Sequence, residues 1–226
     1  AQEPSQARHV ASLAIVDPIS KQRWLLDCTP DFPKQLQLLD DVTKPAVSAP
    51  LDGGLLTHAH VGHYAGLINL GREVMGTKKV PIYAMARMEK FLSSNGPCDQ
   101  LVKLGNIEIR SIKHGQTFSL SSRIKVTPIT VPHRDEYSET VAYRIEGPSR
   151  SALWLPAIDK WSRWETPIES VVAKVDRAWI DGTFYDDGEL PGRNMSEIPH
   201  PFIVESMERF STLPKTERGK LHFIHL

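Results

Sequence analysis

Cysteines and long apolar runs are scarce in this sequence. Only Cys28 and Cys98 occur among 226 residues, which excludes a disulfide framework as the main source of stability but leaves one bridge open. Cys28 follows an apolar stretch, which is typical of a small buried residue rather than a nucleophile. No apolar run approaches the ~18 residues of a membrane-spanning helix, so we expect a soluble protein without a membrane partner. The compartment, cytoplasmic or periplasmic, stays open.

An excess of charge of either sign is also missing. Lysine plus arginine and aspartate plus glutamate both number 27, so the sequence gives no reason to expect a nucleic-acid partner. We therefore expect a small-molecule substrate as the partner, and a homodimer stays open as a further association.

Linkers and repeats are absent as well. No Pro/Ser/Gly-rich linker divides the chain, and no repeat with a period of roughly 20–50 residues is visible. Hydrophobic residues make up 40% and charged residues 24%, which predicts a well-packed core. A single domain over residues 1–226 is therefore expected.

The apolar patterning predicts a mixed α/β chain, because strand and helix periods alternate along it. Strands are predicted at residues 10–16, 23–27, 52–57, 81–84, 107–112, 117–119, 124–131, 140–146, 151–155, 176–181 and 221–226. Helices are predicted at residues 32–41, 61–74, 86–93, 168–174 and 202–210.

A histidine cluster is the most informative stretch that the sequence contains. His58, His60 and His63 fall within Thr57-His-Ala-His-Val-Gly-His63, directly after an apolar strand. Histidine is the commonest metal ligand among side chains, and its neutral ring suits zinc and iron. Residues 58 and 60 lie on the same side of an extended segment, and His63 could reach a second metal. A surface loop that merely happens to be rich in histidine is the alternative.

Four more candidate side chains follow predicted strands, where ligands from neighbouring strands converge at one sheet edge. They are His133, Asp159, Asp181 and His225. Asp159 could instead cap its loop or pair with Lys160 or Arg163. His133 could be a salt-bridged loop residue, and His225 a buried strand residue. For Asp181 we favour supporting the following turn or orienting a ligand. The remaining histidines are expected to be exposed or packed: His9, His114, His200 and His222.

The stretch THAHVGH resembles the HxHxDH signature of the metallo-β-lactamase superfamily. The longer motifs THAHVGHYAGL, VPHRDEYSETVAYRIEG, DGTFYDDGELPGR and HPFIVESMERF resemble its pyrroloquinoline quinone biosynthesis protein B-like branch. More distantly, they resemble phosphonate-breakdown cyclic phosphodiesterases and tRNA 3′-processing phosphodiesterases. The resemblance implies an α/β fold, the four-layer αβ/βα sandwich, with a metal site between its two sheets. Because family members begin with a further glycine-rich strand and continue past the last histidine, both ends are expected to be truncated.

Two positions depart from the pattern of the superfamily. Gly62 stands where the signature has an aspartate, which in the family binds a second metal and helps to position water. Ala157 stands where the resemblance places a carboxylate that bridges two metals. Asp159 is the nearest replacement for that carboxylate.

The resemblance implies a metal-dependent hydrolase that attacks a phosphodiester, another ester or a lactone through a metal-bound hydroxide. It assigns His58, His60 and His133 to the first metal. His63, Asp159 and His225 are then expected at a second metal, with Asp159 as the catalytic carboxylate. One or two zinc ions are expected, with iron or manganese left open. The alternatives are an iron-dependent oxygenase related to quinone-cofactor biosynthesis and a degraded, non-catalytic binding protein.

Overall fold

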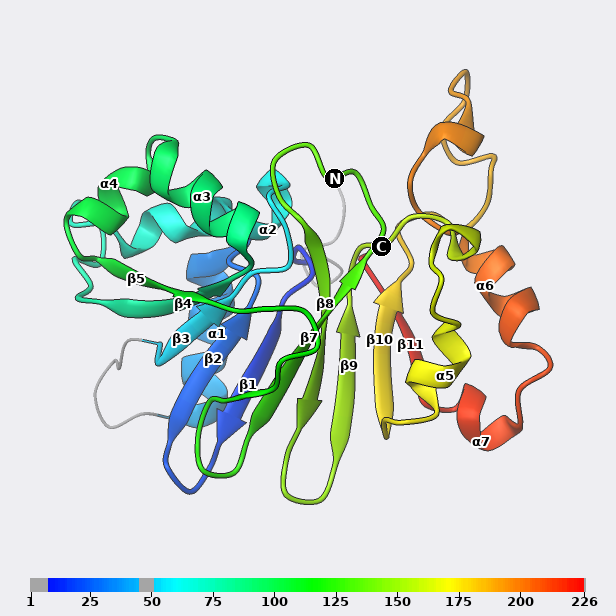
Figure 1. Cartoon of the computed structure of the whole chain (residues 1–226), viewed down its shortest axis with the longest axis horizontal. Helices are drawn as coiled ribbons and strands as arrows, with labels where there is room; N and C mark the ends of the chain where they lie inside the picture. The colour runs from blue at the N-terminus through cyan, green and yellow to red at the C-terminus, as the bar shows by residue number, and fades with distance from the viewer. Residues whose placement is uncertain (1–7, 45–50, 226) are drawn as a thin grey trace. The chain divides into compact units, whose positions relative to one another are not determined.

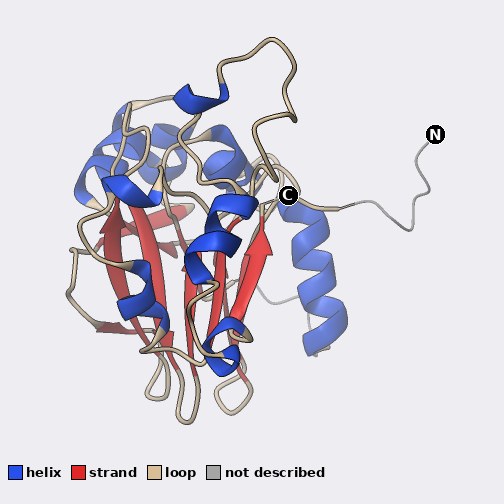
Figure 2. Ribbon diagram, turned by 90° about the vertical axis from the view of Figure 1, so that its right-hand side faces the viewer, coloured by secondary structure: helices blue, strands red, loops and turns tan. Residues whose placement is uncertain are grey.

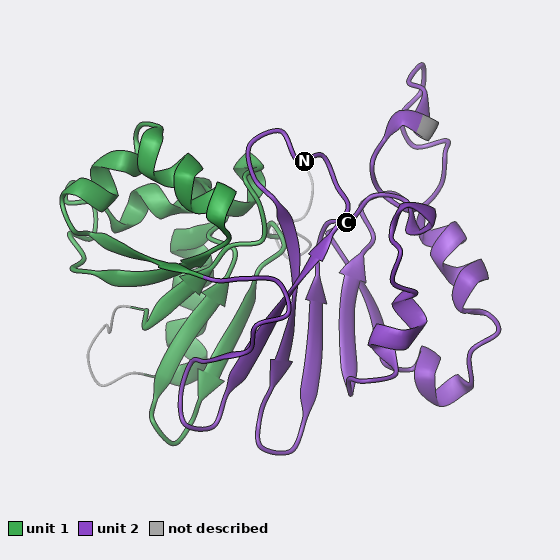
Figure 3. Cartoon of the chain, in the orientation of Figure 1, with its two compact units in different colours: residues 1–111 green, residues 112–226 purple. Residues whose placement is uncertain are grey.

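The chain divides into two compact units, residues 1–111 and residues 112–226, here called the first and the second unit (Figure 3). The structure is a computed structural model, and it describes residues 8–44 and 51–225. Each unit is built around one β-sheet, and the expectation of a single domain over 1–226 stays a prediction.

The first unit holds a five-stranded sheet in the order β1-β2-β3-β4-β5 (Figure 1). Only β1 and β2 pair antiparallel, and the other neighbours are parallel. The strands are β1 (Leu13–Asp17), β2 (Gln22–Leu26), β3 (Gly53–Leu55), β4 (Val80–Ala84) and β5 (Ile107–Ser111). The helical segments are α1 (Phe32–Thr43), α2 (Val61–Tyr64), the 3-10 helix η2 (Ala65–Leu70), α3 (Ala86–Ser94) and α4 (Cys98–Lys103).

The core of the first unit joins its helices to its sheet. Helix α1 buries Phe32 and Leu39 at helical spacing, and both belong to one apolar cluster with Leu25 of β2 and Ile82 of β4. Cys28 lies in the same cluster, and both cysteines are free and buried. Burial, helped by the charge of the adjacent aspartate, raises the pKa of the Cys28 thiol. The prediction that Cys28 is a buried packing residue is confirmed.

The second unit holds a six-stranded sheet in the order β11-β10-β9-β8-β7-β6. Its strands are β6 (Phe118–Ser119), β7 (Lys125–Val131), β8 (Thr140–Glu146), β9 (Ser151–Leu155), β10 (Arg177–Asp181) and β11 (Leu221–Ile224). Its helical segments are η3 (Trp161–Arg163), α5 (Ile168–Val172), η4 (Met195–Glu197), α6 (Ile203–Phe210) and α7 (Lys215–Arg218), which Figure 2 separates by colour from the strands.

The pairing of β9, β10 and β11 determines which residues of the second unit meet. The three strands run parallel, so their carboxyl ends lie at one edge of the sheet. Asp181 ends β10, and His225 follows β11 directly. Helix α5 and Phe210 of α6 pack in one apolar cluster with β9 and β10, which supports this edge.

The predicted strands all have counterparts among the described residues, with ends shifted by a few positions. The predicted helix over 61–74 is wrong, because α2 ends at Tyr64 and continues as the 3-10 helix η2. The short helices α4 and α7 were not predicted. No helix within residues 8–44 and 51–225 is long and apolar enough to cross a membrane.

Candidate metal centre

The histidine cluster follows β3 and opens α2. His58 and His63 are buried and His60 is half-buried. His60 has an extended backbone, so the rings of His58 and His60 project to the same side, as their spacing predicts. The Nε2 atom of His58 and the Nδ1 atom of His60 face each other at 2.9 Å. Two imidazole nitrogens of the first unit therefore lie within hydrogen-bond distance of each other.

Asp27, directly after β2, makes hydrogen bonds to this cluster. The sequence did not predict this residue as part of the site. Its side chain is fully buried, and its carboxylate accepts hydrogen bonds from the backbone N–H of Thr57 at 2.8 Å and from the Thr57 hydroxyl at 2.9 Å. Its second oxygen lies 2.8 Å from Nδ1 of His63. The signal available in the sequence was a charged residue at the end of an apolar strand. Asp27 also adopts a φ of 62°, a conformation that is uncommon outside glycine and that often marks functional positions.

A second cluster lies at the sheet edge of the second unit, where Asp181, His200 and His225 bring potential ligand atoms within 4.8 Å of one another. One oxygen of Asp181 accepts from the hydroxyl of Thr183 at 2.6 Å, and the other lies 2.6 Å from Nδ1 of His200. The Thr183 hydroxyl also lies 2.8 Å from Nδ1 of His225. Asp181 thus supports the following turn and orients a neighbouring histidine, as expected from the sequence.

The charge state of Asp181 follows from these contacts. Burial is the largest influence and raises its pKa, but the hydrogen bond and charge of His200, the Thr183 hydroxyl and the charge of His225 act in the opposite direction. Together they hold the pKa of Asp181 below its ordinary value. Asp181 is therefore a buried carboxylate that can accept hydrogen bonds at neutral pH.

His133 and His225 both lie beside His200. The ring of His133, two residues after β7, packs edge-on against that of His200 with centroids 4.9 Å apart. The centroids of His200 and His225 are 6.1 Å apart. Sequence reasoning named His133 and His225 but set His200 aside. The motif HPFIVESMERF, which begins with His200 just before α6, was the signal that could have included it.

Asp159 has other partners. Its carboxylate lies 2.7 Å from a guanidinium nitrogen of Arg163 and accepts the backbone N–H of Lys160 at 2.7 Å. These are the capping and pairing contacts that the sequence left open as its alternative role. In the part of the chain that the structure describes, the metal-type cluster of the second unit does not include Asp159, so its role as a ligand and catalytic carboxylate stays a prediction.

The two departures from the signature differ in their surroundings. A β-carbon added at Gly62 would meet only a methyl carbon of Val10, at 3.9 Å. Ala157, by contrast, is almost fully buried, with 1% of its surface exposed. Position 62 therefore has room for a side chain, whereas a side chain at position 157 is enclosed by protein.

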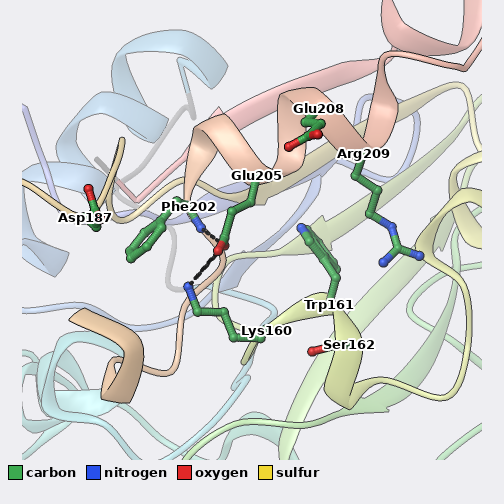
Figure 4. A pocket seen from close by; sticks show the side chains of 8 residues that line it. All are labelled: Lys160, Trp161, Ser162, Asp187, Phe202, Glu205, Glu208 and Arg209. Carbon is green, nitrogen blue, oxygen red and sulfur yellow. Dashed lines mark hydrogen bonds and ion pairs between the residues drawn. The ribbon is translucent and has the colours of Figure 1, made fainter. Parts of the chain in front are cut away.

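A cavity of about 610 Å³ lies on the second unit beside Lys160 and Trp161 (Figure 4). Lys160 reaches into it, with its ammonium 3.1 Å from a carboxylate oxygen of Glu205 and 3.6 Å from the ring centroid of Phe202. Its lining carries charges of both signs, which indicates no single class of ligand: Lys160, Trp161, Ser162, Asp187, Phe202, Glu205, Glu208 and Arg209.

The donor set fits a borderline transition metal. At 2.9 Å the facing nitrogens of His58 and His60 are at hydrogen-bond distance, and both are close enough to bind one cation in place of the shared hydrogen. Imidazole nitrogens with buried carboxylates behind them are the donors that zinc and iron prefer, and such outer partners orient the ligands.

Comparisons with known proteins identify the family. A family model described as Beta-lactamase superfamily domain matches residues 22–225. Ribonuclease Z of Acaryochloris marina is 29% identical over 119 residues, which cover 51% of this chain and 36% of the relative. Coenzyme PQQ synthesis protein B of Methylorubrum populi is 26% identical over 200 residues, which cover 82% of this chain and 64% of the relative. The chain thus spans less than two thirds of either curated relative.

The fold has a crystallographic counterpart as well. The crystal structure of Zn(2+)-bound PqqB from Methylobacterium extorquens matches with a TM-score of 0.77 at 19% identity, covering 96% of this chain and 77% of that chain. The two-sheet α/β architecture and the family match confirm the expected metallo-β-lactamase fold. The chain therefore belongs to the metallo-β-lactamase superfamily.

Proposed function

We propose that the chain is a zinc-dependent hydrolase of small phosphodiesters or related esters. Within the first unit the metal-holding side chains are His58, His60 and His63, and within the second unit they are His133 and His225. Asp159 is left out of this set because Arg163 and a backbone N–H already engage its carboxylate.

The facing ring nitrogens of His58 and His60 carry this proposal. Two imidazole nitrogens within 2.9 Å of each other are close enough to bind one cation, and histidine ligands with an open position are the pattern of catalytic zinc. When bound, a zinc ion supplies an activated water, because it lowers the pKa of that water toward about 7. His58 is buried, so the surrounding protein limits the motion of its ring.

His200 is the side chain suited to move a proton. Its Nδ1 lies 2.6 Å from the buried carboxylate of Asp181, so Nδ1–H donates there and Nε2 is the atom that can take up or release a proton. With 13% of its side chain exposed, His200 is accessible to a substrate while Asp181 is not. We assign His200 to take up a proton at Nε2 from the attacking water and to release that proton to the leaving oxygen.

The choice of a phosphodiester rests on similarity to a ribonuclease and on charge. Ribonuclease Z of Acaryochloris marina is among the relatives, and by its name it acts on RNA phosphodiesters. This chain has equal numbers of basic and acidic residues, which favours a small substrate over a long polyanion.

Turnover of bis(p-nitrophenyl) phosphate by the zinc-loaded chain tests this function. We expect hydrolysis by the wild type and by His9→Ala, because His9 is exposed and contacts only a surface carboxylate in the described residues. His60→Ala should lower kcat/KM by at least about 100-fold, because it removes one of the two facing nitrogens. Equal turnover in the wild type and His60→Ala would contradict the proposal.

Metal content and oxygen consumption of the purified chain distinguish a hydrolase from an iron-dependent oxygenase. An oxygenase would contain iron and would consume oxygen with a tyrosine-containing peptide. Iron content and oxygen consumption, without hydrolysis of the diester, would contradict the proposed reaction but not the proposed metal site.

A further inference from the structure

The same four-residue arrangement occurs once in each unit. In the first unit it consists of Asp27, Thr57, His58 and His63, here called the Asp27 anchor. Asp27 accepts the backbone N–H of Thr57 at 2.8 Å and the Thr57 hydroxyl at 2.9 Å. Nδ1 of His58 lies 2.9 Å from that hydroxyl, and Nδ1 of His63 lies 2.8 Å from the other oxygen of Asp27.

In the second unit the arrangement consists of Asp181, Thr183, His225 and His200, here called the Asp181 anchor. Asp181 accepts the backbone N–H of Thr183 at 3.0 Å and the Thr183 hydroxyl at 2.6 Å. Nδ1 of His225 lies 2.8 Å from that hydroxyl, and Nδ1 of His200 lies 2.6 Å from the other oxygen of Asp181. His225 therefore corresponds to His58, and His200 to His63.

The position of the hydroxyl hydrogen follows from the acceptors. A threonine hydroxyl has one hydrogen and two lone pairs, whereas a carboxylate has only lone pairs. An oxygen–oxygen distance of 2.6 Å, as between Thr183 and Asp181, requires a hydrogen between the two atoms. The hydroxyl hydrogen is thus used on the aspartate, and only a lone pair of the hydroxyl remains for His225.

We infer that Thr57 and Thr183 are positioning residues that fix the tautomers of His58 and His225. Each hydroxyl accepts Nδ1–H of its histidine, because its own hydrogen is already donated to the aspartate. A neutral imidazole with a hydrogen on Nδ1 carries its lone pair on Nε2. The paired aspartate does the same directly for His63 or His200, so each anchor presents two histidines with Nε2 as the acceptor.

This inference deepens the proposed function, on which its metal-binding consequence rests. A histidine ligates a metal only through an unprotonated ring nitrogen, and the hydrogen bond at the other nitrogen decides which one that is. Without the threonine hydroxyl, His58 or His225 would divide between two tautomers, one of which cannot ligate through Nε2. Loss of such an outer partner lowers metal affinity by about 10–100-fold.

Nitrogen NMR of the full chain, labelled at its histidines, tests the tautomers directly. At about pH 8.5, above the ordinary histidine pKa of about 6.5, long-range proton–nitrogen correlations distinguish protonated from unprotonated ring nitrogens. In the metal-free wild type we expect His58 and His225 to carry hydrogen on Nδ1. Hydrogen on Nε2 of either ring would overturn the inference for that anchor, and this measurement needs no variant to fold.

Matched variants at Thr183 distinguish the effect of its hydroxyl on the His225 tautomer from the effect of its side-chain shape on packing. Thr183→Val keeps the shape but removes the hydroxyl, so His225 should show a second tautomer while His58 stays unchanged, and zinc affinity should fall about 10–100-fold. Thr183→Ser keeps the hydroxyl and should retain the wild-type tautomer and affinity. An unchanged tautomer in Thr183→Val would overturn the inference. If the wild type shows Nδ1–H but binds no zinc, the anchors stand and the proposed function fails.

Discussion

Gly62 stands where the HxHxDH signature has an aspartate, and packing does not explain this difference. A β-carbon at this position would meet only Val10, at an ordinary contact distance of 3.9 Å. The glycine is therefore not required by packing. It removes one carboxylate from the first unit and leaves imidazole nitrogens as the donors of the cluster.

Restoring the carboxylate should increase metal binding. We expect Gly62→Asp to fold normally and to raise zinc affinity by at least about tenfold, which corresponds to ~1.4 kcal/mol. Gly62→Asn, of the same size but without charge, is the matched control and should bind zinc more weakly than Gly62→Asp. Competition with a chromogenic chelator measures both. Identical affinities for the two variants would show that position 62 does not face the metal.

At the level of elements, the single helix predicted over 61–74 does not form because of a tertiary contact. A β-carbon at Gly66 would come within 2.1 Å of the carbonyl oxygen of Thr29, and the N–H of Gly66 donates to the carbonyl of Cys28 at 2.8 Å. The chain is thus pressed against the end of β2, and α2 tightens into η2 there. Local periodicity contains no information about such a contact.

Strands were more predictable than helices in this chain. Their apolar alternation is set by burial on a sheet face, as in β8 and β9, whose predicted and observed limits coincide. Short helices such as α4 and α7 leave little periodicity to detect, so the sequence could not reveal them.

Helices α5 and α6 are joined by a bidentate ion pair with a defined pH dependence. Nε of Arg209 lies 2.6 Å from one oxygen of Glu169, and Nη2 lies 3.0 Å from the other. The hydrogen bond from Arg209 is the largest influence, and it lowers the pKa of Glu169. Because the folded pKa is the lower one, the stabilisation is complete above the unfolded pKa of about 4.3 and is lost as pH falls through the folded pKa.

Replacing this glutamate should therefore matter most at neutral pH. We expect Glu169→Gln to lower the free energy of unfolding by about 0.5–1 kcal/mol at pH 7, since the pair is partly exposed to solvent. Near pH 3, below the unfolded pKa of about 4.3, the difference from the wild type should be smaller. Urea unfolding at both pH values measures it, with Glu165→Gln, an exposed glutamate before α5, as control. A difference that is equally large at pH 3 would show that Glu169 acts through packing.

At the scale of the whole molecule, the candidate ligands were easier to predict than the residues that orient them. His58, His60, His63, His133 and His225 stand in motifs that a single sequence displays. Their functional contacts, however, depend on hydrogen bonds between segments far apart in the chain. Asp27 meets His63 across 36 positions, and Asp181 meets His200 across 19. Such partners become visible only when the strands that carry them are placed in a sheet.

One Asp–Thr–histidine arrangement is repeated in the two units. In each unit a buried aspartate at the end of an interior strand contacts two histidines or their threonine. Asp27 directly follows β2, and Asp181 is the last residue of β10. The two departures, Gly62 and Ala157, leave these anchors untouched. A chain that has lost two carboxylates of the family pattern therefore retains the residues that orient its histidine donors.

The metal content of the full chain, purified without chelator and measured by emission spectrometry, shows directly whether the histidine cluster holds a metal. We expect at least one zinc ion per chain in the wild type and in His9→Ala, and a marked loss in His60→Ala. A wild type free of transition metal, or a content that His60→Ala leaves unchanged, would contradict it.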